Sequence, residues 1–207
     1  MKKGRYPPLE IYFDNSATTR VSNSSAQRAL ELMQEEFGNP SSLHRKGFLA
    51  EQALAAARED LAAILGPGVR REEIWFTSCG SEGNNLAVLG AARAAQKRGN
   101  KVVTTAVEHE SVLAPVKHLS ENGFETVLLP PTPQGNVDPQ SVEEAVDQRT
   151  VLLSVMLVNS ETGAVNDLLS IAQAARRKNP KVVIHCDCVQ GFGKLLADSF
   201  PALLCPI

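Results

Sequence analysis

Residues 101–129 read KVVTTAVEHESVLAPVKHLSENGFETVLL, and this stretch decides the fold. Two short runs rich in β-branched residues, 101–105 and 125–129, predict strands. Between them, apolar residues recur at helical spacing: Val112, Leu113, Val116 and Leu119. Pro115 is expected in the first turn of that helix, where proline is tolerated. A strand, a helix and a second strand in this order predict two parallel strands joined by a crossover helix.

The same alternation continues on both sides of this unit. Further strands are predicted at 73–77, 151–158 and 181–184, and further helices at about 48–65, 82–96 and 171–177. Several of the strands are apolar on both faces, which is typical of a parallel sheet covered by helices. The predicted fold class is therefore α/β, with a mostly parallel sheet flanked by helices.

The chain has 207 residues and is expected to divide into three parts. Residues 1–65 form an N-terminal helical segment with little strand signal. Residues 66–194 form a partial α/β domain, and residues 195–207 carry no clear strand or helix signal.

Composition excludes several classes of function. A net charge of −2 gives no electrostatic reason to expect nucleic acid or an anionic membrane. The N-terminal residues lack the apolar stretch of a secretory signal, and the longest apolar run, 151–158, is too short to span a bilayer. The cysteines have no secreted-scaffold spacing, which favours a reducing, cytoplasmic compartment. They are Cys79, Cys186, Cys188 and Cys205.

Two loops that follow predicted strands carry candidate site residues, because ligands collect outside the carboxyl ends of parallel strands. Residues 77–82, TSCGSE, offer small residues and backbone N–H groups at a helix start, which suits an anion. The alternative is a plain serine N-cap. His109 follows strand 101–105 and could stack on a flat cofactor or move protons. Its alternative is a solvated loop histidine.

A third loop, His185-Cys186-Asp187-Cys188-Val189-Gln190, follows strand 181–184. Asp187 at a buried strand end needs a cation, and a protonated pyridine nitrogen is one that fits. A metal site is the competing interpretation. Alternation along a strand sends His185 and Asp187 to one side and both cysteines to the other, so no metal is predicted. Cys186 and Cys188 are expected to pack as small apolar side chains.

The ordered motifs of the chain resemble the cysteine desulfurase and selenocysteine lyase family, a class-V aminotransferase-like group. They are Tyr12 to Thr19, Gly38 to His44, Phe76 to Ser78 with Glu82, Asn84 and Asn85, Glu108-His109, Val158 to Gly163, and His185-x-Asp187-x-x-Gln190-x-x-Gly193-Lys194. The resemblance implies the fold-type-I large domain of an enzyme that depends on pyridoxal 5′-phosphate.

The resemblance also implies roles for individual residues. Gly80 and Ser81 would bind the cofactor phosphate, His109 would stack on the ring and take part in catalysis, and Asp187 would pair with the ring nitrogen. Gln190 would contact the phenolic oxygen, and Asn159 would lie near the ring. The reaction would convert L-cysteine to L-alanine, with the sulfur passed to an enzyme cysteine as a persulfide. Cys79 is not predicted to be that cysteine.

The family holds its cofactor through the lysine of a Ser-x-His-Lys motif, which has no counterpart between residues 1 and 207. Lys194 matches a different position, and Lys101 and Lys181 lie at strand starts. The resemblance therefore predicts a fragment that is inactive or nearly so by itself. Alternatives are a non-catalytic fragment that binds a partner, such as a full-length homologue or a sulfur-acceptor protein, and a selenocysteine or cysteine sulfinate preference. The complete family member would be a homodimer, with a role such as iron–sulfur cluster assembly.

Overall fold

The computed structural model describes residues 11–195, which fall into two compact units divided between Gln52 and Ala53. The first unit holds helix α1 (Asn23–Gln34), begun by the Ser22 side chain as its N-cap, and the start of helix α2 (Arg45–Leu65). Two glycines let the loop before α2 pack closely on the helix start. A Cβ at Gly38 would overlap the Lys46 carbonyl, and one at Gly47 would overlap that of Ser42.

The second unit is built on a four-stranded parallel sheet. Its strands are β1 (Lys101–Thr105), β2 (Glu125–Leu129), β3 (Thr150–Ser154) and β4 (Val183–His185), in the order β2-β1-β3-β4. β1 and β3 lie in the centre, and every residue of both strands is buried. All three pairings are parallel, so the four strands end at one edge of the sheet.

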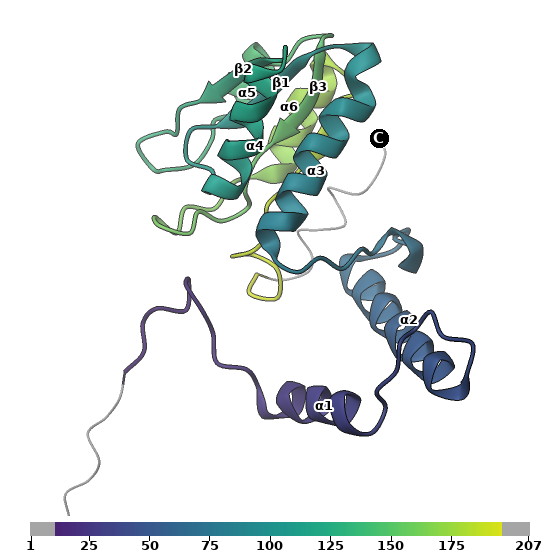
Figure 1. The fold of residues 1–207 in the computed structure, drawn as a ribbon. Coiled ribbons are helices and arrows are strands. Elements are labelled where there is room, and N and C mark those ends of the chain that lie inside the picture. Colours follow the sequence, from purple (N-terminus) through teal and green to yellow (C-terminus); the bar gives the residue numbers. More distant parts are fainter. Residues whose placement is uncertain (1–10, 196–207) are drawn as a thin grey trace, which may run out of the picture. The chain divides into compact units, whose positions relative to one another are not determined.

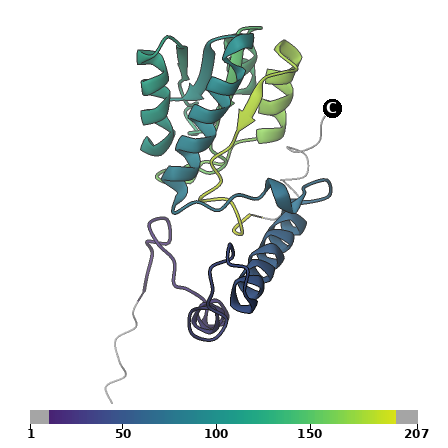
Figure 2. The same ribbon diagram turned by 45° about the vertical axis from the view of Figure 1, so that its right-hand side comes forward.

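Helices cover both faces of this sheet (Figure 1). Alternate residues of β1 separate two buried clusters. Val102 packs with α3 (Gly80–Ala95) and α4 (Glu110–Glu121), whereas Val103 packs with α5 (Pro139–Ala145) and α6 (Leu168–Lys178). Figure 2 shows the helices on the two sides of the sheet from a second direction. The predicted α/β class, with a parallel sheet flanked by helices, is confirmed.

Residues 73–77, predicted as a strand, are the main error in the sequence prediction. A 3-10 turn, η1 (Arg71–Glu73), comes first, and residues 74–77 are extended but pair with no strand among the described residues. The Ile74 carbonyl instead accepts a hydrogen bond of 3.1 Å from Arg58 Nε. Without a neighbouring strand to satisfy its backbone groups, an apolar run forms no ladder.

The other differences concern boundaries and one missed helix. The strand predicted at 151–158 ends at Ser154, and β4 is shifted from 181–184 to Val183–His185. Pro115 lies in the second turn of α4, where the Ser111 carbonyl it cannot bond accepts a weak hydrogen bond from Asn85 Nδ2 at 3.4 Å. Helix α5 was not predicted, and a second 3-10 turn, η2 (Gln96–Arg98), follows α3.

No helix within residues 11–195 has the length and apolar character needed to cross a membrane. The predicted tail, 195–207, lies almost wholly outside the described residues, as does Cys205.

Candidate functional site

Loops from distant parts of the second unit meet at the edge where the parallel strands end, here called the rim. α3 starts beside the loop that follows β4: a Cβ on Gly80 would lie 3.3 Å from Cγ2 of Val189. Further along α3, Asn84 is hydrogen-bonded to Asp187. The two loops that the sequence singled out as phosphate and ring-nitrogen sites therefore lie side by side.

Asp187 is the buried charge of this rim, with 8% of its surface exposed. Its Oδ2 accepts a hydrogen bond of 2.8 Å from Asn84 Nδ2, and its Oδ1 accepts one of 2.9 Å from the Val189 N–H. Neither donor is charged, and within residues 11–195 no lysine, arginine or histidine forms an ion pair with this carboxylate. A carboxylate buried without a cation is costly, so Asp187 favours a cationic ligand.

A hydrogen-bond chain runs from Asp187 to His109. Asn84 Nδ2 donates its second hydrogen to Ser111 Oγ at 2.9 Å, and Ser111 Oγ lies 2.8 Å from His109 Nδ1. The Ser111 backbone N–H also donates to Nδ1, at 3.1 Å, in the N-cap of α4. Because Nδ1 accepts, the neutral ring carries its proton on Nε2. The exposed imidazole is thereby fixed at the rim.

Glu108, next to His109, is a second buried carboxyl group, only 6% exposed. Its Oε1 accepts hydrogen bonds from Thr105 Oγ1 at 2.9 Å and from the Met156 N–H at 2.8 Å. Its Oε2 is buried with no partner among the described residues. Burial raises the pKa of Glu108 to about 7, helped by the charge of Asp187 and opposed by the two hydrogen bonds. A carboxyl that is half protonated near neutral pH therefore lies under the rim.

The start of α3 presents backbone N–H groups without a side-chain cap. Its N-cap is Cys79, which makes no capping hydrogen bond, and Gly80 and Ser81 form the exposed first turn. The backbone N–H of Glu82, the Ser78 hydroxyl and the Ser81 N–H together lower the pKa of the Cys79 thiol. These N–H groups therefore favour negative charge on the Cys79 sulfur.

Asn159 and Gln190, the other predicted contacts, are engaged within the protein. Asn159 is buried; its Nδ2 donates to the Val107 carbonyl at 2.9 Å and its Oδ1 accepts from the Thr162 N–H at 2.8 Å. It fastens the loop after β3 to the loop after β1. Gln190 is half-buried, and its Oε1 accepts from Lys194 Nζ at 2.7 Å. Their contact with a cofactor stays a prediction.

Comparison with known proteins fixes the family. A sequence model of the aminotransferase class-V family matches residues 11–199. The chain belongs to the class-V aminotransferase family.

Named relatives of this family member are similar over nearly all of its length. The cysteine desulfurase IscS of Photobacterium profundum is 40% identical over 193 residues, which are 92% of this chain and 47% of the relative. A solved NifS-like protein superposes with a TM-score of 0.85 at 36% identity, covering 90% of this chain and 50% of the other. SspA in complex with cysteine gives a TM-score of 0.83 at 32% identity, covering 92% and 54%. The chain spans about half the length of the relatives it matches.

The family depends on pyridoxal 5′-phosphate, and the rim of this class-V chain fits that cofactor. Asp187 offers a buried carboxylate with no cation of its own within the described residues, which suits a protonated pyridine nitrogen. The first turn of α3 offers N–H groups to a phosphate, and His109 offers an exposed, oriented ring.

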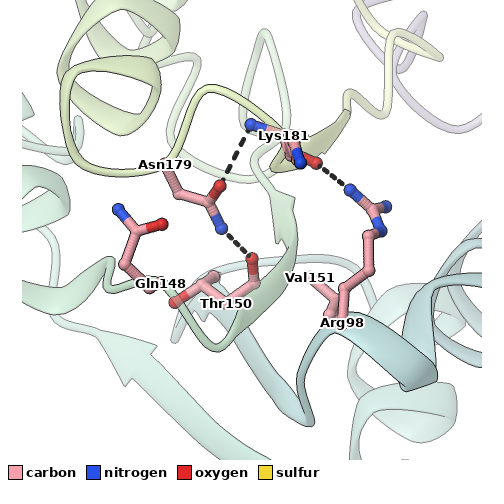
Figure 3. A pocket seen from close by; sticks show the side chains of 6 residues that line it. All are labelled: Arg98, Gln148, Thr150, Val151, Asn179 and Lys181. Carbon is pink, nitrogen blue, oxygen red and sulfur yellow. Dashed lines mark hydrogen bonds between the residues drawn. The ribbon is translucent and has the colours of Figure 1, made fainter.

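The opposite edge of the sheet holds a different kind of pocket. A cavity of about 210 Å³ is lined by residues around the starts of β3 and β4, among them Arg98, Asn179 and Lys181 (Figure 3). Asn179 bonds the Thr150 carbonyl at 2.8 Å, and Arg98 Nη1 bonds the Lys181 carbonyl at 2.7 Å. These groups are paired within the protein, and they lie at the strand starts rather than at the strand ends where the family site is expected.

Sequence reasoning gave no role to three residues that organise the rim. Asn84 and Glu108 were recognised only as parts of motifs, and Ser111 was given no role. A polar residue at a position that faces the sheet is a usable signal: Asn84 is buried in α3 four residues before the buried Val88.

Proposed function

We propose that this chain forms the pyridoxal-phosphate-binding part of a cysteine desulfurase, with L-cysteine as the substrate. The hydrogen-bond chain Asp187–Asn84–Ser111–His109 carries the proposal, because it joins the loop after β4, helix α3 and the start of α4, which come from separate parts of the sequence. The similarity to cysteine desulfurases over 92% of the chain supports the choice of substrate.

Asp187 would hold the proton on the ring nitrogen of the cofactor. When bound, pyridoxal phosphate supplies an electron sink for bond breaking at the substrate α-carbon, and protonation of the ring nitrogen strengthens this sink. The Asn84 amide and the Val189 N–H fix both carboxylate oxygens, so the carboxylate would receive the cation without reorganising.

His109 and the start of α3 would orient the ring between them. The hydrogen bonds at Nδ1 keep the imidazole plane fixed, which suits stacking on a flat ring and leaves Nε2 to face the substrate as a proton carrier. Gly80 and Ser81 would receive the phosphate, and the small Gly80 leaves room for the close contact with Val189. Gln190 and Asn159 would contact the phenolic oxygen and the ring.

The 207-residue polypeptide is proposed to bind the cofactor without a covalent link. Lys101 and Lys181 lie at the strand starts, and Lys194 Nζ is bonded to Gln190 Oε1. Turnover, a sulfur-acceptor partner, pairing into a homodimer and a cytoplasmic role in iron–sulfur cluster assembly belong to the proposal for the whole enzyme. Selenocysteine is the alternative substrate.

The test is a titration of the purified chain with pyridoxal phosphate, followed by absorbance and by quenching of the fluorescence of Trp75. Saturable binding is expected, and treatment with borohydride should leave no cofactor attached to the protein. The variant Asp187→Asn keeps the shape of the side chain and removes its charge. It should weaken binding by about a hundredfold, as expected when one partner of a buried charge pair is removed.

Asp138→Asn is the matched control. Asp138 is the exposed N-cap of α5, and asparagine caps a helix about as well as aspartate, so this variant makes the same charge change away from the rim. It should bind the cofactor as the unmodified chain does. Equal binding by the chain and by Asp187→Asn would overturn the assignment of Asp187. No saturable binding at all would overturn the proposed function.

A further inference from the structure

Two cysteines on either side of Asp187 lie in contact. Cys186 Sγ and Cys188 Sγ are 3.4 Å apart, in the loop that follows β4. Both side chains are half-buried and pack against the cluster on the α5 and α6 side of the sheet, as alternation along an extended segment predicts. Asp187 points to the other side, toward Asn84 in α3.

The backbone between the two cysteines allows a covalent link after a local adjustment. Two residues that are two positions apart in an extended segment have Cα atoms about 6.6 Å apart, which lies within the range that disulfides span. Both thiols belong to one loop, so no other segment of the chain has to move to bring them together.

The two thiols are chemically unequal. The hydrogen bond between them raises the pKa of Cys186, as does burial, and the same bond lowers the pKa of Cys188. Cys188 is therefore the better nucleophile, and Cys186 is the thiol that holds its proton. The acidic groups beside the pair are Asp187 and Glu108, and both disfavour a second negative charge on Cys186.

We propose that Cys186 and Cys188 form a reversible dithiol–disulfide pair that responds to low-molecular-weight disulfides. The Cys188 thiolate attacks one sulfur of the reagent and expels a thiolate, which gives a mixed disulfide. Cys186 then loses its proton to solvent and attacks Cys188 Sγ, and the second reagent thiolate leaves. The protein pair gives up two electrons and two protons, and the reagent is reduced to two thiols.

Formation of the disulfide should shift the Asp187 carboxylate, which lies between the two cysteines. Asp187 accepts four hydrogen bonds. Its carboxylate accepts from Asn84 and Val189, and its carbonyl accepts from the Leu157 N–H at 2.9 Å and from Cys186 Sγ at 3.8 Å. Drawing the two sulfurs from contact to bonding distance turns the backbone on both sides of Asp187. If the proposed function holds, the oxidised chain binds pyridoxal phosphate about tenfold more weakly, the loss expected for one misplaced hydrogen bond to a charged group.

Peptide mapping tests the pair directly. The chain is incubated with oxidised glutathione, remaining thiols are alkylated, and the protein is digested with trypsin. Residues 182–194, VVIHCDCVQGFGK, form one tryptic peptide that contains both cysteines and no other. We expect this peptide to carry no alkyl group and to be lighter than the reduced peptide by two hydrogen atoms. Reduction followed by alkylation should give the doubly alkylated form. Glutathione on this peptide, or two alkyl groups once Cys79 has reacted fully, would overturn the proposal.

Two variants complete the test. Cys186→Ser should trap glutathione on Cys188, whereas Cys188→Ser should react slowly, because the more acidic thiol is gone. Cofactor titration of the reduced and oxidised chain gives the second readout. A closed disulfide with unchanged affinity would overturn the effect on the rim. No cofactor binding in either state would count against the proposed function, while the peptide map still decides the pair.

Discussion

Each edge of the same sheet buries charged side chains, and the two edges differ in how those charges are compensated. Lys101 starts β1 and Asp187 follows β4, and each is 8% exposed. Lys101 Nζ lies 3.0 Å from Asp147 Oδ2 and 3.7 Å from Glu125 Oε1, and Arg149 joins the same group of charges. Asp187 has only neutral donors among the described residues, and Glu108 beside it keeps one oxygen unpartnered.

This difference separates a part of the molecule that stabilises the fold from a part that is prepared to bind. At the strand starts, the cost of burying a charge is offset within the chain. At the rim it is left uncompensated, which lowers stability and gives a ligand of the right charge a large share of its binding energy. Substitutions at the two edges should therefore change different quantities.

The largest expected effect is on the starting edge. Asp147→Ala removes the nearest counter-ion of Lys101 and the acceptor for the Arg149 N–H, which bonds Asp147 Oδ1 at 2.7 Å. The free energy of unfolding should fall by about 3 kcal/mol, as measured by urea denaturation. Asp147→Asn keeps that acceptor and should lose about half as much. Weaker cofactor binding without loss of stability would contradict the division between the edges.

The next effect is a dependence on pH that comes from Glu108. The unfolded carboxyl loses its proton near the ordinary pKa of 4.5, but the folded one loses it near 7. Between these values the folded state binds more protons, so this group lowers stability as the pH rises from about 4.5 to 7. Glu108→Gln should raise the free energy of unfolding at pH 8 by about 2 kcal/mol relative to the unmodified chain, and by little at pH 5.

The pH experiment compares the free energy of unfolding of the unmodified chain with that of Glu108→Gln, because His185 changes stability with pH in the opposite direction to Glu108. Burial lowers the pKa of His185, and the charge of Asp187 raises it again. Below its ordinary pKa the unfolded histidine binds more protons, so His185 increases stability as the pH rises. Subtracting the two denaturation series cancels His185. A difference that stays constant with pH would contradict the raised pKa of Glu108.

A smaller contrast compares two buried asparagines. Asn179 joins the Thr150 carbonyl to the Lys181 N–H, with hydrogen bonds of 2.8 and 3.0 Å, near the strand starts. Asn179→Ala should lower the free energy of unfolding by about 2 kcal/mol and leave cofactor affinity unchanged. Asn84→Ala, which removes a hydrogen bond from the Asp187 carboxylate, should weaken cofactor binding by about tenfold. Stability is measured by calorimetry and affinity by titration. Weaker cofactor binding in Asn179→Ala than in Asn84→Ala would contradict the comparison.

The smallest effect concerns the Cys79 thiol at the start of α3. Its lowered pKa should make it the fastest thiol to react with iodoacetamide near neutral pH. Pyridoxal phosphate seated on the same N–H groups should slow that reaction by about threefold or more, whereas pyridoxal, which lacks the phosphate, should not. The rate of Cys79 alkylation is followed by mass spectrometry. Equal rates in the presence of the two compounds would contradict a phosphate site at this turn.

The sequence predicted the elements that depend on local pattern. β1 and β2 were placed correctly, because their β-branched runs are bounded by polar segments, and the sheet was correctly expected to be parallel. The strand at 73–77 was wrong because a strand needs a partner, which a local pattern cannot supply. Helix α5 was missed because it has only seven residues, although Asp138-Pro139 is a recognisable start for it.

The sequence predicted that the candidate residues share one edge of the sheet, but it did not predict the hydrogen bonds between them. Asp187, His109 and the start of α3 were expected at one edge because parallel strands end together, and the structure places them there. The roles of Asn84 and Glu108 could not be predicted, since they depend on which side chain each one meets. In the sequence alone, Asn84 is indistinguishable from an ordinary helix residue, because its partner Asp187 is not known.

The Asn84–Asp187 hydrogen bond joins residues 103 positions apart in the sequence. During synthesis the ribosome must therefore release the whole segment between α3 and Asp187 before this contact can close, and β4 must already have docked on β3. If the proposed function holds, cofactor binding must follow the docking of β4. A nascent chain halted before β4 would carry a formed βαβ unit and no affinity for the vitamin-derived ligand.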